Sequence, residues 1–144
     1  MKTITLMTLK NEEWIIDTTF PIIEKISDEI IVANNNSSDK SVELLRKYNV
    51  EIINSDSTTH SNKIRWKLLD EARKRYGNNN LIMCIDADEF VPPELFLKSK
   101  NNIESESPGT VLLHLGFKSG EMLNNIEMIK VFGIQKLTQN HLCF

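Results

Sequence analysis

Short apolar runs alternate with longer polar or amphipathic stretches along this chain. Each run is four to eight residues long, mostly apolar and flanked by polar residues. This pattern is typical of strands that are buried on both faces of a sheet. The predicted strands cover residues 3–9, 29–33, 50–53, 81–85 and 110–117.

The stretches between the runs have the features of helices. Apolar residues recur every four positions from Ile64 to Tyr76, which predicts a helix over residues 61–77 with Gly77 at its C′ position. Further helices are predicted over residues 12–26, 39–48 and 94–98, the last of them opened by two prolines.

Some boundaries are less regular. Pro21 is expected to kink or split the first helix, with Thr19 capping the second piece. Ser38 or Asp39 is expected to cap the next helix. Residues 126–134 suit either a strand or a helix.

This alternation predicts an α/β domain with a mainly parallel central sheet and helices on both faces, in a single domain of residues 1–144. Right-handed crossovers bring the loops that follow the strands to one edge, where ligands bind. Polar clusters follow the first four strands, at residues 10–12, 34–39, 56–60 and 86–89. The sequence therefore predicts a polar crevice at this edge. The alternative is that these loops are polar, as in any α/β protein, and bind nothing.

The most distinctive cluster is the acidic turn, residues 86–89, with the sequence Asp86-Ala87-Asp88-Glu89. Three carboxylates that emerge at the end of a buried strand repel one another, and a divalent cation relieves the repulsion. Carboxylate and water oxygens suit Mg²⁺ or Mn²⁺, and Mg²⁺ usually takes one or two protein carboxylates together with phosphate oxygens. The turn therefore indicates a metal–diphosphate site, and a solvated acidic turn is the alternative.

Composition narrows the class of protein. The chain has 144 residues, is 40% hydrophobic and 26% charged, and carries a net charge of −3, which argues against a general nucleic-acid-binding protein. Cys84 and Cys143 are too few for a disulfide framework, and Cys84 is expected to be a buried small hydrophobic residue. No signal peptide or membrane-spanning run is evident. A cytoplasmic location is expected, and attachment to the inner face of the membrane stays open.

Several nucleotide-binding classes lack their motifs here. Neither Gly-x-Gly-x-x-Gly nor Gly-x-x-x-x-Gly-Lys-Ser/Thr follows the first strand, which argues against a dinucleotide-binding Rossmann enzyme and a P-loop NTPase. The first loop also lacks the Gly-rich, Arg-bearing signature of a sugar nucleotidyltransferase. A haloacid-dehalogenase-type phosphatase would carry its paired aspartates after the first strand, not the fourth.

Four motifs in order resemble family-2 glycosyltransferases of the GT-A fold. They are the Asn-Glu-Glu turn within residues 7–13, the segment 28–41, the Lys-Ile-Arg of residues 63–65 and the Asp-Ala-Asp-Glu that ends segment 85–89. Their order and spacing agree with the family over residues 1–98. The resemblance implies a Rossmann-like GT-A fold that binds a nucleotide-sugar.

The resemblance also implies roles for individual residues. Asp88 would ligate Mn²⁺ or Mg²⁺ on the diphosphate, and Asp86 would bind the ribose or share the water shell of the metal. The residues expected to border the base, the ribose or the phosphates are Thr8, Leu9, Glu12, Asn34, Asn35, Arg65 and Lys63.

Simpler interpretations exist for several of these positions. Glu12 can favour the start of a helix, and Arg65 can lie on a solvated helix face. Asp39 is expected to be a helix cap rather than a ligand contact. Trp14 and Trp66 are expected in the core or lining a groove rather than as platforms for a sugar ring.

The chain departs from the family pattern in three respects. Asn34 and Asn35 stand where the family has at least one Asp, and Asn36 replaces a Gly, although Asn tolerates positive φ best among the other residues. The chain is also short, so the domain is expected to be incomplete on the acceptor side. Glu121 and Glu127 are then the only candidates for a catalytic base.

The sequence leads to two functional hypotheses. The first is the donor-binding part of an inverting, metal-dependent glycosyltransferase, which passes a sugar, expected to be UDP-linked, to a hydroxyl of a glycan or lipid-linked acceptor in polysaccharide or lipopolysaccharide synthesis. The second is a non-catalytic nucleotide-binding or protein-interaction module, with a homo-oligomer formed through an open sheet edge.

Overall fold

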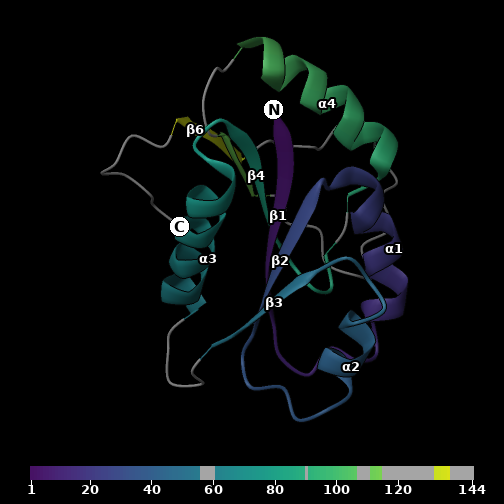
Figure 1. The fold of residues 1–144 in the computed structure, drawn as a ribbon. Coiled ribbons are helices and arrows are strands. Elements are labelled where there is room, and N and C mark those ends of the chain that lie inside the picture. Colours follow the sequence, from purple (N-terminus) through teal and green to yellow (C-terminus); the bar gives the residue numbers. More distant parts are fainter. Residues whose placement is uncertain (56–60, 90, 107–110, 115–131, 137–144) are drawn as a thin grey trace.

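The computed structural model of the chain describes residues 1–55, 61–89, 91–106, 111–114 and 132–136, and strands alternate with helices as predicted (Figure 1). The elements of the described residues are, in order, β1 (Lys2–Leu9), α1 (Ile16–Ile26), β2 (Glu29–Asn34), α2 (Ser41–Leu45), β3 (Glu51–Asn54), α3 (Ser61–Tyr76), β4 (Asn80–Asp86), α4 (Pro93–Glu106), β5 (Val111–His114) and β6 (Phe132–Lys136).

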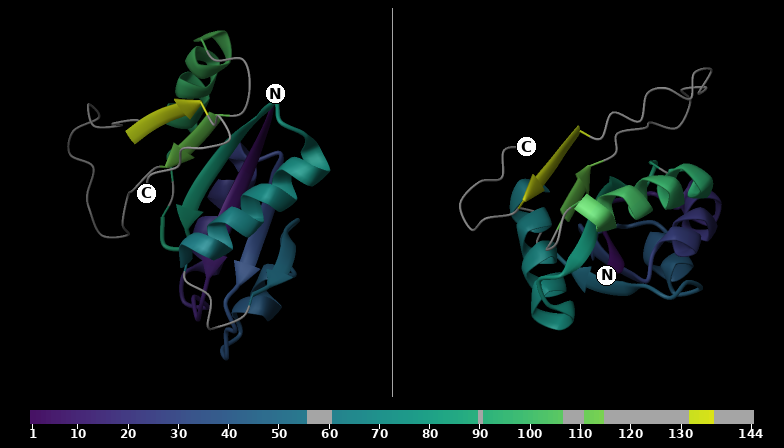
Figure 2. Two further views of the ribbon diagram at one scale, coloured as in Figure 1. Left: turned by 90° about the vertical axis from the view of Figure 1, so that its left-hand side faces the viewer. Right: turned by 90° about the horizontal axis from the view of Figure 1, so that it is seen from above.

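The strands form one sheet in the order β3-β2-β1-β4-β5-β6. Strands β1 to β5 pair in parallel and β6 runs antiparallel to β5, so the predicted, mainly parallel sheet is confirmed. Figure 2 shows β5 and β6 on the side of the sheet away from β3. The residues of β4 are almost all buried, whereas those of the edge strand β3 are half-buried or exposed. Continuous apolar runs thus correspond to strands covered on both faces.

Helices cover both faces of the sheet, as the sequence predicted. Helices α1, α2 and α4 lie on one face and α3 lies on the other (Figure 1). Each face has its own apolar cluster: Phe20 and Val91 belong to the first, and Ile64 and Leu68 to the second. The sheet therefore separates two cores, and its carboxyl edge lies between the two helical layers.

Helix α3 agrees closely with the prediction. Ile64, Leu68 and Ala72 are buried against the sheet, which is the face that their four-residue spacing indicated. Gly77 follows the helix with a φ of +80°, a conformation that glycine adopts without strain, and its N–H donates to the carbonyl of Arg73.

The prediction for α1 was wrong in one respect, because Pro21 does not split the helix. Helix α1 runs unbroken from Ile16 to Ile26. The hydrogen bond that proline cannot make would go to the carbonyl of Asp17, which lies in the exposed first turn where water can replace it. Thr19 is not a cap either: it lies inside the helix, and its hydroxyl donates to the carbonyl of Ile15 at 3.3 Å.

Two further helices differ in length from the prediction. Helix α2 ends at Leu45 rather than near Tyr48, because Lys47 and Tyr48 make tighter bonds to the carbonyls three residues earlier. Helix α4 is longer than predicted and continues to Glu106, since no Pro or Gly interrupts the chain before Pro108.

The last predicted elements fall partly outside the described residues. The predicted fifth strand, residues 110–117, overlaps β5, and residues 110 and 115–117 lie outside the described ranges. Of the segment 126–134, only the last three residues are described, and they belong to β6. In the part of the chain that the structure describes, no helix is long and apolar enough to cross a bilayer.

Candidate functional site

The register of the sheet brings the predicted site residues to one edge. Thr8 of β1 lies beside Asp86 of β4, and Leu9 lies beside Asn34 of β2, which in turn lies beside Asn54 of β3. The loops after β1, β2 and β4 therefore start side by side, as expected from parallel strands. Residues 56–60, the polar cluster after β3, lie outside the described residues.

Hydrogen bonds join the first loop (residues 10–15) to the second loop (residues 35–40). The backbone N–H of Asn11 donates to Ser37 Oγ at 3.0 Å, and the N–H of Ser38 donates to Asn11 Oδ1 at 2.8 Å. Asn11 has a φ of 56°, a left-handed conformation that Asn tolerates better than most residues. The N–H of Glu12 donates to Ser41 Oγ at 2.8 Å. The Asn-Glu turn of the sequence motif thus holds the two loops together.

Glu13 and Asp39 make a second set of bonds between these loops. The N–H of Glu13 donates to Asp39 Oδ2 at 3.1 Å, and the N–H of Lys40 donates to Glu13 Oε2 at 2.8 Å. Asp39 Oδ1 also accepts the N–H of Ser41 at 3.0 Å. Burial works to raise the pKa of Asp39, but these hydrogen bonds outweigh it and lower the pKa below its usual value. Asp39 is not the N-cap of α2, which is Lys40, so its expected role as a cap was wrong by one residue.

Asn34 and Asn35 differ in what their amides do. Asn34 is buried, its Nδ2 donates to Asn54 Oδ1 at 3.2 Å, and its Oδ1 accepts the N–H of Ser37 at 3.1 Å. The side chain of Asn35 is half-buried and accepts a bond from Ser55 Oγ at 3.5 Å. Asn35 is therefore the more accessible of the two residues expected at the base edge. Asn36 has a φ of 55°, which confirms that it takes the place of a glycine.

Asp86, the first residue of the acidic turn, is held by two side chains. Arg65 Nη2 donates to Asp86 Oδ1 at 2.8 Å, and Thr8 Oγ1 donates to the same oxygen at 3.4 Å. The side chain of Arg65 is only 19% exposed, so the alternative of a solvated helix face was wrong. Lys63, two residues earlier on α3, is exposed. Arg65 thus connects α3 to the edge of the sheet.

Glu89, the last carboxylate of the acidic turn, and Thr19, which sequence reasoning had not assigned to the site, also hold this turn. The N–H of Asp86 donates to Glu89 Oε2 at 2.9 Å, and the N–H of Glu89 donates to the carbonyl of Asp86 at 3.0 Å. Thr19 Oγ1 of α1 donates to the carbonyl of Ala87 at 3.0 Å. The sequence placed Glu89 in the acidic turn but not its bond back to Asp86, and no sequence signal links Thr19 to a segment 68 residues away.

Asp88 stands apart from its neighbours. Its side chain is half-buried and makes no hydrogen bond or ion pair with any residue that the structure describes.

Burial raises the pKa of Glu12, a hydrogen bond from Trp14 opposes this, and the charges of Asp88, Asp39 and Asp86 raise it further. The acidic turn therefore lies within electrostatic range of the first loop.

The donor set of this edge decides which metal site is feasible. Within the described ranges, no group of three or more His, Cys, Asp or Glu side chains is placed to hold a metal ion. Asp86 Oδ1 is already paired with Arg65, whereas Asp88 offers an oxygen donor without a partner in the described chain. These residues fit a hard cation that keeps most of its ligands from water and a diphosphate, and they do not form a protein-only cage.

The two tryptophans are on the surface, so of their two expected places, in the core or lining a groove, the core was wrong. Trp14 is 63% exposed and Trp66 is 39% exposed. Trp14 Nε1 donates to Glu12 Oε2 at 2.9 Å, which fixes the indole beside the first loop. Cys84 is buried as predicted, and burial raises the pKa of its thiol to about 12.

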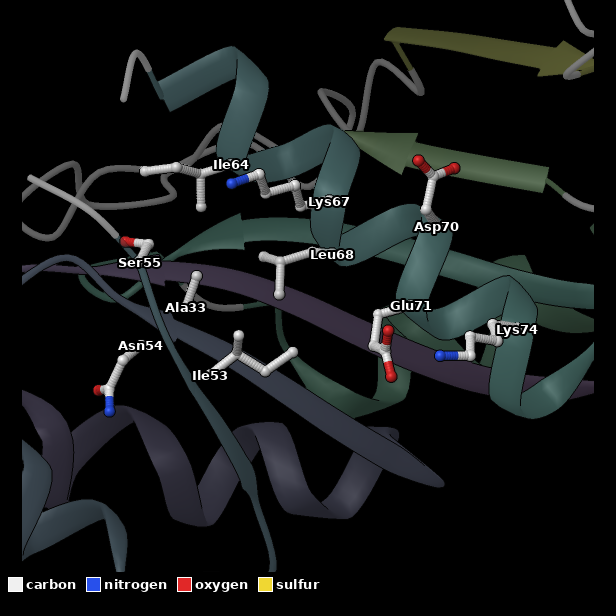
Figure 3. A pocket seen from close by; sticks show the side chains of 10 residues that line it. All are labelled: Ala33, Ile53, Asn54, Ser55, Ile64, Lys67, Leu68, Asp70, Glu71 and Lys74. Atoms are coloured by element: carbon white, nitrogen blue, oxygen red, sulfur yellow. The ribbon is translucent and has the colours of Figure 1, made fainter. Parts of the chain in front are cut away.

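A groove of about 410 Å³ lies between α3 and strand β3 (Figure 3). Ala33 of β2 and Ile53 of β3 line it on the side of the sheet, Leu68 lines it from α3, and Ser55 follows the end of β3. Sequence reasoning missed this groove, because no sequence pattern shows that α3 leaves the edge strand uncovered. Its remaining lining residues are Asn54, Ile64, Lys67, Asp70, Glu71 and Lys74.

Comparison with known proteins identifies the class. The family model for glycosyl transferase family 2 matches residues 5–142, so the chain belongs to this family of sugar-transferring enzymes. The candidates for a catalytic base, Glu121 and Glu127, fall within this match but outside the described residues.

The chain is also similar to two known proteins. The chain is 30% identical over 94 residues to the uncharacterized glycosyltransferase YkcC of Bacillus subtilis (strain 168), a match that covers 61% of this chain and 29% of YkcC. The crystal structure of S. aureus TarS 1-349 is similar in fold, with a TM-score of 0.61 at 20% identity, over 73% of this chain and 33% of that one. The match to TarS confirms the predicted GT-A fold. The chain spans about a third of the length of these proteins.

Proposed function

We propose that this domain binds a nucleotide-diphosphate sugar, with UDP as the nucleotide, for transfer of the sugar to a hydroxyl acceptor. One observation carries the proposal. Three loops meet at the carboxyl edge of the sheet, and their other carboxylates bond within the protein, whereas Asp88 has no partner among the described residues. A carboxylate left unpaired among bonded ones is a candidate ligand for a cation.

The roles of the residues follow from their positions. Asp88 provides the carboxylate for Mn²⁺ or Mg²⁺, which would neutralise charge that develops on the leaving diphosphate. Asp86, oriented by Arg65 and Thr8, accepts a hydrogen bond from a ribose hydroxyl. Asn35 both donates and accepts, as recognition of a pyrimidine edge requires. Glu12 and the backbone of Leu9 border the nucleoside.

The complete reaction requires more than the donor site. Inversion needs a carboxylate within hydrogen-bond reach of the acceptor hydroxyl, and Glu121 and Glu127 are the candidates in this chain. We propose a glycan or lipid-linked acceptor in polysaccharide or lipopolysaccharide synthesis, with the protein in the cytoplasm at the inner face of the membrane.

Isothermal titration calorimetry with UDP tests the donor site directly. The protein is expected to bind UDP in the presence of Mn²⁺, and Asp88→Ala is expected to abolish this binding or to weaken it on the order of 100-fold. Asp70→Ala removes the same charge from an exposed position on α3 and serves as the matched control. Absence of binding in the unaltered protein, or equal binding in the Asp88 variant, would contradict the proposal.

The edge strand favours a second candidate, a non-catalytic interaction module. Strand β3 ends the sheet and pairs only with β2 in the described part of the chain. An open edge can accept a strand from another chain, including a second copy. Light scattering and donor hydrolysis distinguish the candidates: a monomer that hydrolyses the donor favours the transferase, and an inert oligomer favours the module.

A further inference from the structure

A buried carboxylate closes the acidic turn on itself. Glu89 is only 7% exposed, its Oε2 accepts the N–H of Asp86, and its own N–H donates to the carbonyl of Asp86. We infer that Glu89 is a positioning residue, which fixes the backbone on both sides of Asp88 so that the carboxylate of Asp88 is presented to the cation of the bound donor. This inference rests on the proposed function.

Glu89 supplies the acceptor for the N–H of Asp86. The N–H of Asp86 lies at the end of β4, beyond the last residue of β4 that pairs with β5, which is Cys84. This N–H is part-buried, and leaving it without an acceptor costs part of the roughly 1–3 kcal/mol that a fully buried group loses. Glu89 Oε2 supplies this acceptor at 2.9 Å. Glu89 therefore stabilises the conformation in which the strand changes into the turn.

The two hydrogen bonds between Asp86 and Glu89 enclose two residues. Ala87 and Asp88 lie between Asp86 and Glu89, and Thr19 holds the carbonyl of Ala87 from α1. The backbone on either side of Asp88 is thus restrained by three hydrogen bonds, whereas its side chain has no partner in the described ranges. A ligand that is fixed before binding loses less conformational freedom when the donor arrives.

Three substitutions separate position from charge. Glu89→Ala removes the acceptor. Glu89→Gln keeps an acceptor oxygen at the same reach and removes the charge, whereas Glu89→Asp keeps the charge and is one methylene shorter. Glu94→Ala is the matched control, because Glu94 is exposed in the first turn of α4 and lies outside the acidic turn.

The first readout is independent of any ligand. Amide hydrogen exchange of Asp86, whose N–H donates to Glu89, is measured by NMR on the intact chain and is expected to be at least 10-fold faster in Glu89→Ala than in the unaltered protein. In Glu89→Gln and in the control it is expected to stay within about threefold. Unchanged exchange in Glu89→Ala overturns the inference.

The second readout is the affinity for UDP with Mn²⁺, measured where every variant is folded. Loss of a residue that orients a metal ligand typically weakens metal affinity about 10- to 100-fold, and this is the expected effect of Glu89→Ala. Glu89→Gln is expected to restore the affinity to within about threefold. Equal losses in the Ala and Gln variants overturn the inference, because they show that the charge matters rather than the acceptor.

The remaining outcomes are also decisive. If Glu89→Ala does not fold, Glu89→Gln is compared with Glu89→Asp instead. The inference is supported if Glu89→Gln keeps the exchange rates and the affinity while Glu89→Asp loses them. The opposite result overturns the inference. If the unaltered protein does not bind UDP with Mn²⁺, the proposed function fails, and the exchange rates still decide whether Glu89 fixes the turn.

Discussion

The two halves of the carboxyl edge use their polar residues in opposite ways. In the first and second loops, Asn11, Glu13 and Asp39 each bond across to the other loop. In the acidic turn, Glu89 and Asp86 bond to one another, and Asp88 is left without a partner in the described chain. One half is a closed structural network, and the other is a rigid support for one available carboxylate.

This difference shows that a motif shared with a family need not be a binding motif throughout. The Asn-Glu-Glu turn resembles a ligand-binding loop in sequence, yet most of its bonds hold the second loop in place. The turn then contributes to binding only indirectly, through the positions of Asn35 and Leu9. The N–H of Asn35 donates to the carbonyl of Leu9 at 2.8 Å. Substitutions in the two halves should therefore separate stability from binding.

The largest effect is expected for Asp88→Ala, and it should concern binding alone. Affinity for UDP with Mn²⁺ should fall on the order of 100-fold, about 2.8 kcal/mol. Stability should change by no more than about 0.5 kcal/mol, because the side chain has no bond within the described residues to lose. Urea denaturation beside calorimetry checks both, and a parallel loss of stability would show that Asp88 belongs to the structural network.

Asn11→Ala should have the opposite effect, on stability. We expect a loss of about 2–3 kcal/mol, from the left-handed backbone and from the bond of Asn11 Oδ1 to Ser38. Asn36→Ala is the matched control, because Asn36 has nearly the same φ but no side-chain bond within the described residues, and should lose only about 1 kcal/mol. Equal losses in urea denaturation would mean that the bond between the loops contributes nothing.

Thr19→Val tests the link between α1 and the acidic turn. Valine keeps the shape of threonine and leaves the carbonyl of Ala87 without its buried donor, so a loss of about 1–2 kcal/mol is expected. Thr18→Val, at an exposed position on the same helix, should stay within about 0.5 kcal/mol. A similar thermal shift for both variants would assign the loss to helix propensity instead.

The smallest effect concerns pH. The pKa of Asp39 is lower in the folded protein than in the unfolded chain, so its ionised form stabilises the fold at neutral pH. This contribution begins to be lost as the pH falls below about 4, the usual pKa of an aspartate in an unfolded chain. It is fully lost once the pH has passed below the lower pKa of Asp39 in the folded protein. Asp39→Asn should be less stable at neutral pH, and its melting temperature should fall less steeply in acid. Parallel melting curves from pH 6 to pH 2 would exclude this role.

Much of the fold could be predicted from the pattern of the sequence. Continuous apolar runs identified β1 and β4, and the four-residue spacing from Ile64 to Ala72 identified the buried face of α3. Helix ends were less predictable. Whether Pro21 interrupts α1 depends on the exposure of the preceding turn. The end of α2 depends on Tyr48, whose ring centroid lies 5.3 Å from that of Phe20 in α1.

The sequence by itself determined strands β1 to β5, the order of the polar loops and the family, because these depend on local periodicity and on motif spacing. Tertiary structure alone decided which polar residues remain available. Arg65 meets Asp86, and Thr19 meets Ala87, only because α3 and α1 lie on opposite faces of the same sheet. A hydrogen bond depends on distance in space rather than in sequence, so only the folded chain separates the carboxylate of Asp88 from its bonded neighbours.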